Sequence, residues 1–369
     1  MPESALSENG APAPRVISYA DAVREALTEC GRRDRNVLFF AEGIADPSSV
    51  YGTTKGLGVD CPDQLVEMPL SENGLVGVAV GAALVGKRPV ISFHRVEFAL
   101  LAVEQIVNNA AKAHYISRGR HSVPLVIRLV IGRGWGQGPE HSQSLESIFA
   151  HFPGLKVVMP TFPRDAKGML IAAIRDDNPV IVIEHRWCHY TTGATPEGDG
   201  IEALDGPRIV RAGRDVTLVG TSYSTLEALR AADALAVAGI EAEVIDLRVL
   251  RPLVPDLILD SVARTGRLIT IDTGWWRYGI GAEIVAEVAA RRFGALKAAP
   301  IRLGMPEHPT PSSRGMIPGV YPDAIGIVEA VGQQLGLASE IVGSMRAGLI
   351  QARGDLPPDV PDPFFKGPF

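Results

Sequence analysis

The chain has 369 residues, of which 46% are hydrophobic and 21% are charged, and its formal net charge at pH 7 is −6. This length accommodates two domains of ordinary size, each with its own core. The negative charge argues against nucleic acid or an anionic membrane as the main partner, and no apolar run reaches the ~20 residues that a membrane span requires.

The cysteines and the N-terminal residues indicate the compartment. Cys30, Cys61 and Cys188 are too few and too scattered for a disulfide framework or a structural zinc site, which fits a reducing environment. Residues 1–15 are rich in Ala, Pro, Ser and Glu and have no apolar core, so they resemble neither a secretory signal nor a transit peptide. We predict a disordered tail over residues 1–15 and a cytoplasmic protein.

Residues 16–190 alternate between helical and strand patterns. A helix is predicted from Ser18, with Asp21 three residues on as in a capping box. Strands are predicted at 37–40, 89–93, 124–128, 155–159 and 180–184, and helices at 98–113 and 164–174. This alternation predicts an α/β fold with a parallel, doubly wound sheet. Glu42 follows the first strand, and open α/β sheets bind ligands at the carboxyl ends of their strands.

The apolar, small-residue run over residues 74–84 predicts a buried helix whose glycines let another backbone approach closely. Glu72 lies at its N-terminus. Burial raises the pKa of a carboxyl, while the helix dipole and its free N–H groups lower it, so a glutamate placed there is suited to proton sharing. A plainer interpretation stays open on local sequence alone: Ser71 caps the helix and Glu72 is an ordinary first-turn residue.

The periodicity stops over residues 191–213, which predicts a linker between two domains. A second alternation follows, with strands at 216–219, 242–247, 268–271 and 300–303 and helices from 224, at 257–264, at 280–290 and at 322–335. Glu227 is expected to complete a capping box with Ser224. Residues 214–340 therefore predict a second doubly wound domain, and residues 341–369 an irregular C-terminal arm.

Several separated motifs follow one another in a distinctive order. They are Ala41-Glu42-Gly43, Ser71-Glu72-Asn73-Gly74, the segments 105–112 and 153–160, His141-Ser142-Gln143, and the segments 173–180 and 244–253. Over about residues 19–336 the chain resembles the β subunit of the thiamine-diphosphate-dependent decarboxylase component of 2-oxo acid dehydrogenase complexes, of the pyruvate, branched-chain and acetoin types. The resemblance implies the transketolase architecture, in which a pyrimidine-binding domain precedes a transketolase C-terminal domain.

The resemblance also implies roles for individual residues. Glu72 would bond the N1′ nitrogen of the cofactor's aminopyrimidine and so help that group remove the C2 proton of the thiazolium ring. Phe98 would pack on the pyrimidine, although a Phe in an apolar stretch is usually core. His141 would handle protons near the substrate, the alternative being a solvated loop histidine. Glu42 would lie near the cofactor, the alternative being a solvated strand-end carboxylate.

Two further candidate cofactor-binding positions, His94 and Leu101, depart from the family. Residues 94–97 read His-Arg-Val-Glu where relatives carry an apolar or aromatic run, and Leu101 replaces a common Gln. A histidine beside an arginine indicates a more polar or anionic substrate, or side chains that face a partner. Residues 307–315 are nearer to transketolase-like proteins whose acceptor is not a lipoyl domain.

Some family members hold a structural monovalent cation, K⁺, largely through carbonyl oxygens. The matching positions are Leu125, Ala173, Ile174, Asp176 and Asn178. Hard oxygen ligands on a loop suit such an ion. A helix C-terminus that turns into Asn178 explains the same residues without a cation.

The resemblance finally implies a partner. The family holds the diphosphate through Mg²⁺ at a Gly-Asp-Gly motif of a separate α subunit, with Asn-Asn some distance on. Gly198-Asp199-Gly200 looks like its start, but no predicted strand precedes it and no Asn-Asn follows, so we interpret it as a chance match. The chain is expected to supply half of an active site in an α2β2 heterotetramer, with a lipoyl acyltransferase as a further partner.

Three functions remain to be compared. The first is decarboxylation of a 2-oxo acid with transfer of the acyl unit to a lipoyl carrier. The second is a transketolase- or carboligase-like half-enzyme that passes a two-carbon unit to an aldehyde. The third is a non-catalytic scaffold subunit, which would need none of the side chains of Glu72, Phe98 and His141.

Overall fold

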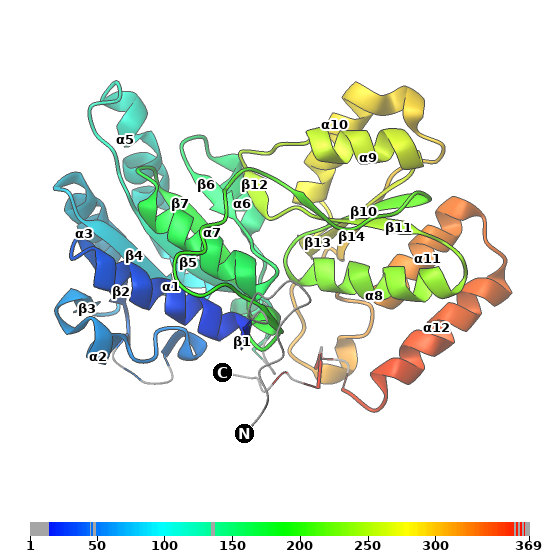
Figure 1. The fold of residues 1–369 in the computed structure, drawn as a ribbon, viewed down its shortest axis with the longest axis horizontal. Helices are drawn as coiled ribbons and strands as arrows, with labels where there is room; N and C mark the ends of the chain where they lie inside the picture. The colour runs from blue at the N-terminus through cyan, green and yellow to red at the C-terminus, as the bar shows by residue number, and fades with distance from the viewer. Residues whose placement is uncertain are drawn as a thin grey trace, which may run out of the picture.

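The structure is a computed structural model that describes residues 15–44, 46, 49–133, 137–357, 359–360, 362–363 and 365. Residues 1–14 of the predicted tail and residues 134–136 of the Gly-rich loop therefore lie outside it. Two lobes lie side by side, each built around one sheet (Figure 1). The sheet of the N-terminal lobe has seven strands in the order β12-β6-β7-β5-β4-β2-β3, and that of the C-terminal lobe has five in the order β14-β13-β10-β11-β9.

The N-terminal lobe confirms the predicted α/β alternation. Its elements are β1 (Val16–Ser18), α1 (Tyr19–Arg33), β2 (Val37–Ala41), α2 (Leu57–Asp60), β3 (Leu65–Glu67), α3 (Glu72–Leu84), β4 (Arg88–Phe93), α4 (Val96–Ala99), α5 (Ala111–Ile116), β5 (Val126–Ile131), α6 (Glu146–His151), β6 (Lys156–Val158), α7 (Pro163–Arg175), β7 (Val180–His185) and β8 (Thr192–Ala194). The pairs β2–β3, β2–β4, β4–β5, β5–β7 and β6–β7 are parallel. The amide of Asp21 donates to Ser18 Oγ at 3.1 Å, which confirms the cap of α1.

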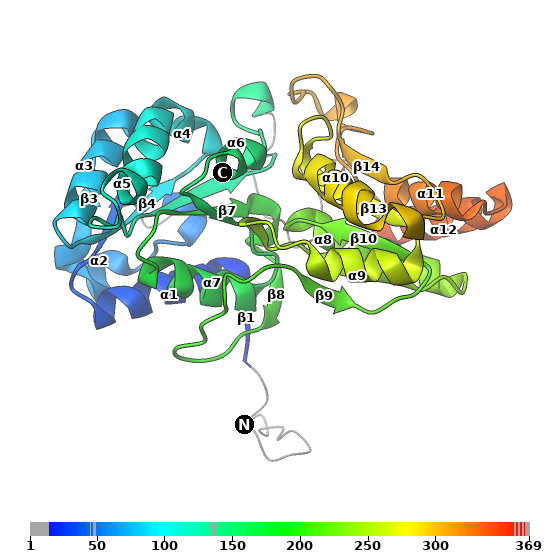
Figure 2. The ribbon, with the colours of Figure 1, turned by 90° about the horizontal axis from the view of Figure 1, so that it is seen from above.

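Helices cover both faces of the seven-stranded sheet, as the doubly wound prediction requires. Phe39 of β2 packs in the core cluster of α1 and α7, whereas the next residue, Phe40, packs in the cluster of α3. Successive side chains of a strand point to opposite faces, so one strand supplies both clusters. Figure 2 shows α1 and α7 on one side of the sheet and α3, α4 and α5 on the other.

The single helix predicted over residues 98–113 is wrong. The segment is broken into α4, a 3-10 turn (Leu100–Ala102), a π-helical turn (Gln105–Ala110) and α5. The break lies beside α3, where a Cβ added at Gly77 would stand 3.5 Å from Gln105 Oε1. Turns of this kind inside helices often accompany functional sites.

The C-terminal lobe repeats the layered plan. Its elements are β9 (Arg208–Arg211), β10 (Val216–Gly220), α8 (Tyr223–Val237), β11 (Ala242–Asp246), β12 (Val249–Arg251), α9 (Asp256–Thr265), β13 (Leu268–Trp275), α10 (Ile280–Arg292), β14 (Ile301–Met305), α11 (Ala324–Leu335) and α12 (Ser339–Arg353). Helices α9 and α10 cover one face of the sheet, and α8, α11 and α12 lie on the other side (Figure 1).

The predicted linker over residues 191–213 is more ordered than expected. It contains β8, which pairs with β1, and β9, which pairs with β11. Conversely, β12 follows β11 in the sequence but pairs with β6 of the N-terminal sheet. Strands of three or four residues are too short to show a periodicity, which explains why the sequence pattern missed them.

The prediction of an irregular arm from residue 341 is wrong for its first part, because α12 continues to Arg353. Ile341, Met345 and Leu349 are four residues apart and so lie on one helical face. Met345 is buried in the cluster formed with α8 and α11. The Pro- and Asp-rich composition of the last residues obscured this apolar spacing.

The predicted capping box at Ser224 is also wrong. Helix α8 begins at Tyr223, and its N-cap, Ser222, makes no side-chain capping bond. Glu227 instead accepts the backbone N–H of Ala324 at 2.9 Å, at the start of α11. This carboxylate therefore joins two helices of the C-terminal lobe rather than capping its own.

One apolar cluster runs across the boundary between the lobes. It contains Phe93 and Ile131 from the N-terminal sheet together with Ile245 and Leu247 from the C-terminal lobe. Cys30, Cys61 and Cys188 are buried thiols without disulfides. Among the helices of the described segments, none is both long and apolar enough to cross a membrane.

Two buried carboxyl groups face each other across this boundary. Glu146 of α6 accepts from Thr273 Oγ1 of β13 at 3.3 Å, and both oxygens of Asp272 accept the N–H of Gly281, at 3.1 and 3.2 Å. Burial, and then the nearby Glu146, raises the pKa of Asp272 to about 7. The unfolded chain binds this proton with an ordinary carboxyl pKa, so stability contributed by protonated Asp272 is complete at low pH and is lost as the pH rises through about 7.

We therefore expect Asp272→Asn to become more stable relative to the parent protein as the pH rises from 5 to 8. The relative gain should be about 2 kcal/mol, since a pKa difference of one unit corresponds to about 1.4 kcal/mol. Urea unfolding at four pH values in this range measures it. Asp260→Asn, at a carboxylate whose side chain is 67% exposed, is the control and should run parallel to the parent. If the free energy of unfolding of Asp272→Asn also ran parallel to that of the parent across this pH range, the raised pKa assigned to Asp272 would be contradicted.

Candidate active site

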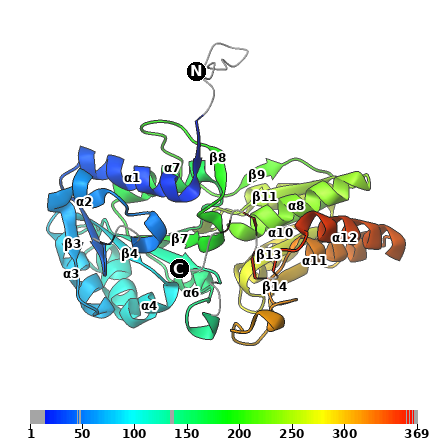
Figure 3. The same cartoon turned by 90° about the horizontal axis from the view of Figure 1, so that it is seen from below.

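The loops that follow β2, β4, β5 and β7 meet at one edge of the N-terminal sheet, because these strands run parallel. Glu42 follows β2, His94 follows β4, and the segment after β5 leads to His141. Helix α3 begins at Glu72, and the preceding Ser71 binds Glu42 at this edge; α4 lies beside α3 (Figure 3). The fold therefore gathers most of the predicted site residues.

Glu42 and Glu72 lie close together. The backbone N–H of Ser71 donates to Glu42 Oε1 at 3.3 Å, one residue ahead of Glu72. Burial, and then the charge of Glu72, raises the pKa of the Glu42 carboxyl, and the N–H of Ser71 opposes this. The charge of Glu72 thus disfavours the ionised form of the neighbouring Glu42.

The plainer interpretation holds for the positions of the two residues but not for a side-chain cap, and Glu72 lies in the first turn of α3. Ser71 occupies the N-cap position of α3, but its side chain makes no capping hydrogen bond. Its backbone N–H instead holds Glu42. The start of α3 is thus organised around the two carboxylates.

The prediction that the α3 helix is buried holds for one face only. Leu75, Val76, Ala79, Val80 and Ala83 are buried, whereas Val78 is 53% exposed and Leu84 is 47% exposed. An added Cβ at Gly81 would have no atom within 4 Å in the described chain. Helix α3 therefore presents an unpartnered apolar face next to Glu72.

Leu101 lies beside the start of α3. Asn73 Nδ2 donates to the carbonyl oxygen of Leu101 at 3.5 Å, and Gln105 Nε2 donates to Asn73 Oδ1 at 3.4 Å. The Leu101 side chain itself is 63% exposed. Its backbone positions Asn73, while its side chain extends the apolar surface of α3.

Phe98 and His141 form a second pair at this edge. Their ring centroids are 5.6 Å apart and the rings are inclined by 53°. Both side chains are partly buried. The structure thus brings a loop histidine against the aromatic residue that the sequence assigned to the pyrimidine.

His94 lies in a separate environment. Its Nε2 accepts the N–H of Val50 at 3.3 Å, and Tyr51 Oη donates to its carbonyl oxygen at 3.2 Å. Burial, and then the charge of Arg95, lowers the pKa of His94. A neutral imidazole that accepts a backbone N–H supports the segment around Tyr51.

Four of the proposed cation ligands gather at the opposite end of the strands. Leu125 and Asn178 precede β5 and β7, and Arg88 Nη1 donates to the carbonyl oxygens of Ile174 and Asp176 at 3.2 and 3.1 Å. The fifth, Ala173, accepts the N–H of Asp176 at 3.2 Å. Burial opposes ionisation of Asp176, but Lys156 and Asn178 outweigh it and hold its pKa low. Arg88 thus already binds two of the carbonyl oxygens that a cation would use.

The Gly198-Asp199-Gly200 motif behaves as a chance match. Asp199 pairs with both Arg175, at 2.8 Å, and Arg33. Its carboxylate therefore serves two surface ion pairs. In the described part of the chain, no group of three or more His, Cys, Asp and Glu side chains has an arrangement that could hold a metal ion.

Sequence reasoning missed a buried network under the site. Arg128 of β5 donates to Glu184 of β7 at 2.6 and 3.0 Å, and His189 Nε2 lies 3.1 Å from the same carboxylate. Arg128 also donates to Ser92 and Thr53, at 2.9 and 2.8 Å. The signal was present in the sequence, because a charged residue inside an otherwise apolar strand requires a buried partner.

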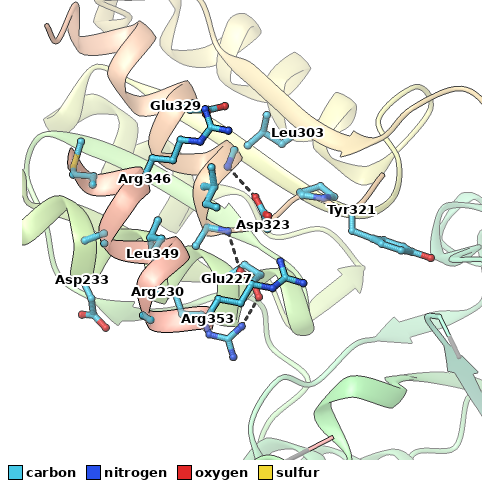
Figure 4. Close-up of a pocket in the computed structure, with 18 of the residues that line it drawn as sticks. Glu227, Arg230, Asp233, Leu303, Tyr321, Asp323, Glu329, Arg346, Leu349 and Arg353 are labelled. Carbon is cyan, nitrogen blue, oxygen red and sulfur yellow. Dashed lines mark hydrogen bonds and ion pairs between the residues drawn. The ribbon is translucent and has the colours of Figure 1, made fainter. Parts of the chain in front are cut away.

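A cavity of about 1610 Å³ lies in the C-terminal lobe, bordered by α8, α11 and α12 (Figure 4). Arginines and carboxylates alternate on its wall: Arg230 pairs with Glu227, and Arg346 Nη1 lies 3.8 Å from Glu329. None of the predicted cofactor residues lines it. The cavity is thus distinct from the candidate site at the carboxyl ends of the N-terminal strands.

Comparison with known proteins identifies the two lobes. The transketolase pyrimidine-binding domain matches residues 15–188, and the transketolase C-terminal domain matches residues 207–327. A solved split-gene transketolase, described as an inactive β4 tetramer, superposes with a TM-score of 0.69 over 87% of this chain and 99% of that chain. Its sequence identity is 24%, so it supports the fold alone.

Curated relatives are closer in sequence. The acetoin:2,6-dichlorophenolindophenol oxidoreductase subunit beta of Cupriavidus necator is 40% identical over 326 residues, which cover 86% of this chain and 96% of that protein. The mitochondrial pyruvate dehydrogenase E1 component subunit beta of Caenorhabditis elegans is 38% identical, over 88% of this chain and 94% of that protein. The human counterpart is 34% identical, over 89% and 93%. With both transketolase domains in place and this identity over most of each relative, the chain belongs to the family of E1-type β subunits of the acetoin and pyruvate dehydrogenases.

Proposed function

We propose that the chain is the β-type subunit of a thiamine-diphosphate-dependent oxidoreductase that cleaves a 2-oxo acid or a related substrate and passes on the acyl or aldehyde unit. The observation that carries the proposal is the meeting of Glu72 with Glu42 at the carboxyl edge of the sheet, where Phe98 and His141 are also paired. A scaffold subunit has no need for such a set of side chains.

The residues present suit the pyrimidine end of thiamine diphosphate. A carboxylate at an open helix start can accept a hydrogen bond from a ring nitrogen, and the partly exposed ring of Phe98 offers a stacking surface. Thiamine diphosphate, when bound, supplies the electron sink for cleavage of the bond next to the carbonyl. Glu72 would hold the proton of the pyrimidine nitrogen, with Glu42 lying beside it.

His141 is placed to move protons at the substrate. It follows the Gly-rich segment, packs on Phe98 and is partly open to solvent. An imidazole titrates near neutral pH, so it can donate and accept a proton within one cycle. Leu101 then shapes one edge of the site through Asn73, while His94 supports the segment around Tyr51.

We further propose an α-type partner that holds the diphosphate through Mg²⁺, in an α2β2 assembly. Gly74, Val78, Gly81 and Val85 are spaced as one helical face of α3, and Val85 is 81% exposed. Small residues on an exposed apolar face let a second helix approach closely. A lipoyl acyltransferase is proposed as the acceptor in the full complex. The proposal assigns no step to K⁺, because Arg88 already binds the carbonyl oxygens of Ile174 and Asp176.

Assembly tests the proposed interface. Val78→Glu, which places a charge on the exposed face of α3, is expected to abolish co-purification with the α-type chain, because the charge would be buried unpaired. Val59→Glu, at a valine of α2 that is 86% exposed, is the matched control and should assemble normally. Light scattering after co-expression measures both. Unchanged assembly of Val78→Glu would show that the partner binds elsewhere.

Activity tests the reaction. The assembled protein, with thiamine diphosphate and Mg²⁺, should reduce a dye acceptor in the presence of pyruvate, a branched-chain 2-oxo acid or acetoin. The acceptor is then varied between a dye, a lipoyl domain and an aldehyde. Transfer to the aldehyde alone would replace the proposal by a carboligase-like half-enzyme. Full activity of the chain expressed without a partner would overturn the half-site assignment.

A further inference from the structure

Two residues at the start of α4 bind the segment that carries His141, one before the histidine and one after it. Arg95 Nη1 donates to the carbonyl oxygen of Gly132 at 3.5 Å, and Arg95 Nη2 bonds the side chain of Gln137. On the far side of His141, Glu97 Oε1 accepts the backbone N–H of Gln143 at 2.8 Å. Residues 95–98 thus supply two anchors and the aromatic ring that packs on the histidine.

Two buried polar atoms at this contact lack a hydrogen-bond partner in the described structure: Glu97 Oε2 and His141 Nδ1. Burial raises the pKa of the Glu97 carboxyl, while the N–H of Gln143 and the charges of Arg95 and His141 oppose this. The two side chains are therefore near enough to interact electrostatically. A buried polar atom without a partner costs about 1–3 kcal/mol, so a hydrogen bond between the two atoms would remove two such penalties.

We propose that Glu97 is a positioning residue for His141: its Oε2 accepts the Nδ1–H of the imidazole and leaves Nε2 as the atom that exchanges protons with the substrate. The hydrogen bond that one ring nitrogen makes decides which tautomer is present and stabilises the imidazolium when Nε2 is protonated. The catalytic meaning of this contact rests on the proposed function, whereas the contact itself does not.

Other charged groups near His141 are accounted for. Arg95 is directed to Gly132 and Gln137. Glu140 precedes His141 in the chain and is exposed. Glu97 is thus the partly buried carboxylate of this set, and the exposed Glu140, adjacent to His141 in the chain, provides a control of equal charge.

The first test uses the parent protein and requires no activity. In ¹⁵N-histidine-labelled protein, with the His141 signals assigned by loss in His141→Asn, neutral His141 is expected as the Nδ1–H tautomer. An isolated imidazole favours Nε2–H, so observation of the Nε2–H tautomer at His141 would overturn the proposal. This measurement is independent of whether any carboxylate variant folds.

The second test compares carboxylate variants by the same titration. Glu97→Gln is expected to lower the pKa of His141 by about one unit, since a neighbouring carboxylate favours the charged imidazolium. Glu140→Gln should lower it much less, and Glu97→Asp should restore part of the shift. Equal effects of Glu97→Gln and Glu140→Gln would contradict a specific contact.

Activity separates this proposal from the function. In the assembled enzyme, Glu97→Gln should move the acidic limb of the pH–rate profile in the same direction as the titration. If the titration shifts but the parent assembly has no thiamine-dependent activity, the Glu97–His141 contact stands and the proposed function fails. If the parent assembly is active and the titration does not shift, the contact fails alone.

Discussion

Replacing Glu72 with glutamine is expected to lower turnover of the assembled enzyme by about 10³-fold, within the range that a positioned acid–base group contributes. Glutamine keeps the size of the side chain but cannot hold the proton of a ring nitrogen. Because Glu72 lies in the first turn of α3 and its side chain is partly exposed, folding and assembly should be unaffected. Steady-state rates at saturating thiamine diphosphate measure the effect.

Two comparisons make the Glu72 result specific. Glu104→Gln changes an exposed carboxylate on the neighbouring segment, where it bonds Gln105 and Asn109, and should leave turnover unchanged. Light scattering of Glu72→Gln should report the parent assembly. Parent-like turnover of Glu72→Gln would remove Glu72 from the proposed role, whatever its place in the fold.

The largest stability effect is expected at Glu184. Glu184→Gln leaves the buried guanidinium of Arg128 without its carboxylate, and breaking a buried ion pair on one side costs about 3–5 kcal/mol. Burial opposes ionisation of Glu184, but Arg128 and His189 outweigh it and lower its pKa to about 2. The stabilisation is therefore present above the ordinary glutamate pKa and is lost as the pH falls towards 2.

Urea unfolding at neutral pH measures the cost of Glu184→Gln. Asp63→Asn is the control, because it breaks a surface ion pair in which the side chain of Arg35 is 69% exposed and that of Asp63 is 75% exposed. This substitution should cost under about 1 kcal/mol. In acid the parent protein should lose more stability than Glu184→Gln. Equal unfolding midpoints for Glu184→Gln and the parent at pH 7 would show that water, rather than Glu184, compensates Arg128.

The main features of the site were predictable because they depend on local patterns. A short apolar run followed by Glu42 predicts a strand and its ligand-binding end, and the small apolar run after Glu72 predicts the helix that it begins. The resemblance to the family, rather than a local pattern, implied that Phe98 and His141 belong to one site. Their ring contact confirms that they lie together.

Other features depend on contacts between distant segments. The break of the helix predicted over residues 98–113 follows from packing against α3, and the bond of Glu227 to Ala324 joins residues 97 positions apart. The pairings of β9 and β12 likewise involve strands too short to show a pattern. The buried, unpartnered atoms of Glu97 and His141 can be identified only once the tertiary structure has placed both side chains.

The sequence by itself determined the order of the α/β elements, the family and the residues at the strand ends, because periodicity and motif spacing are local properties of a chain. Only the tertiary structure decided which faces are covered. The α3 face at Val78 and Gly81 is apolar, yet it stays exposed, since hydrophobicity specifies that a surface is to be buried and not which chain buries it. Likewise, only the structure shows that the backbone N–H of Ser71 binds Glu42 at the start of α3, because that contact depends on where β2 and α3 converge.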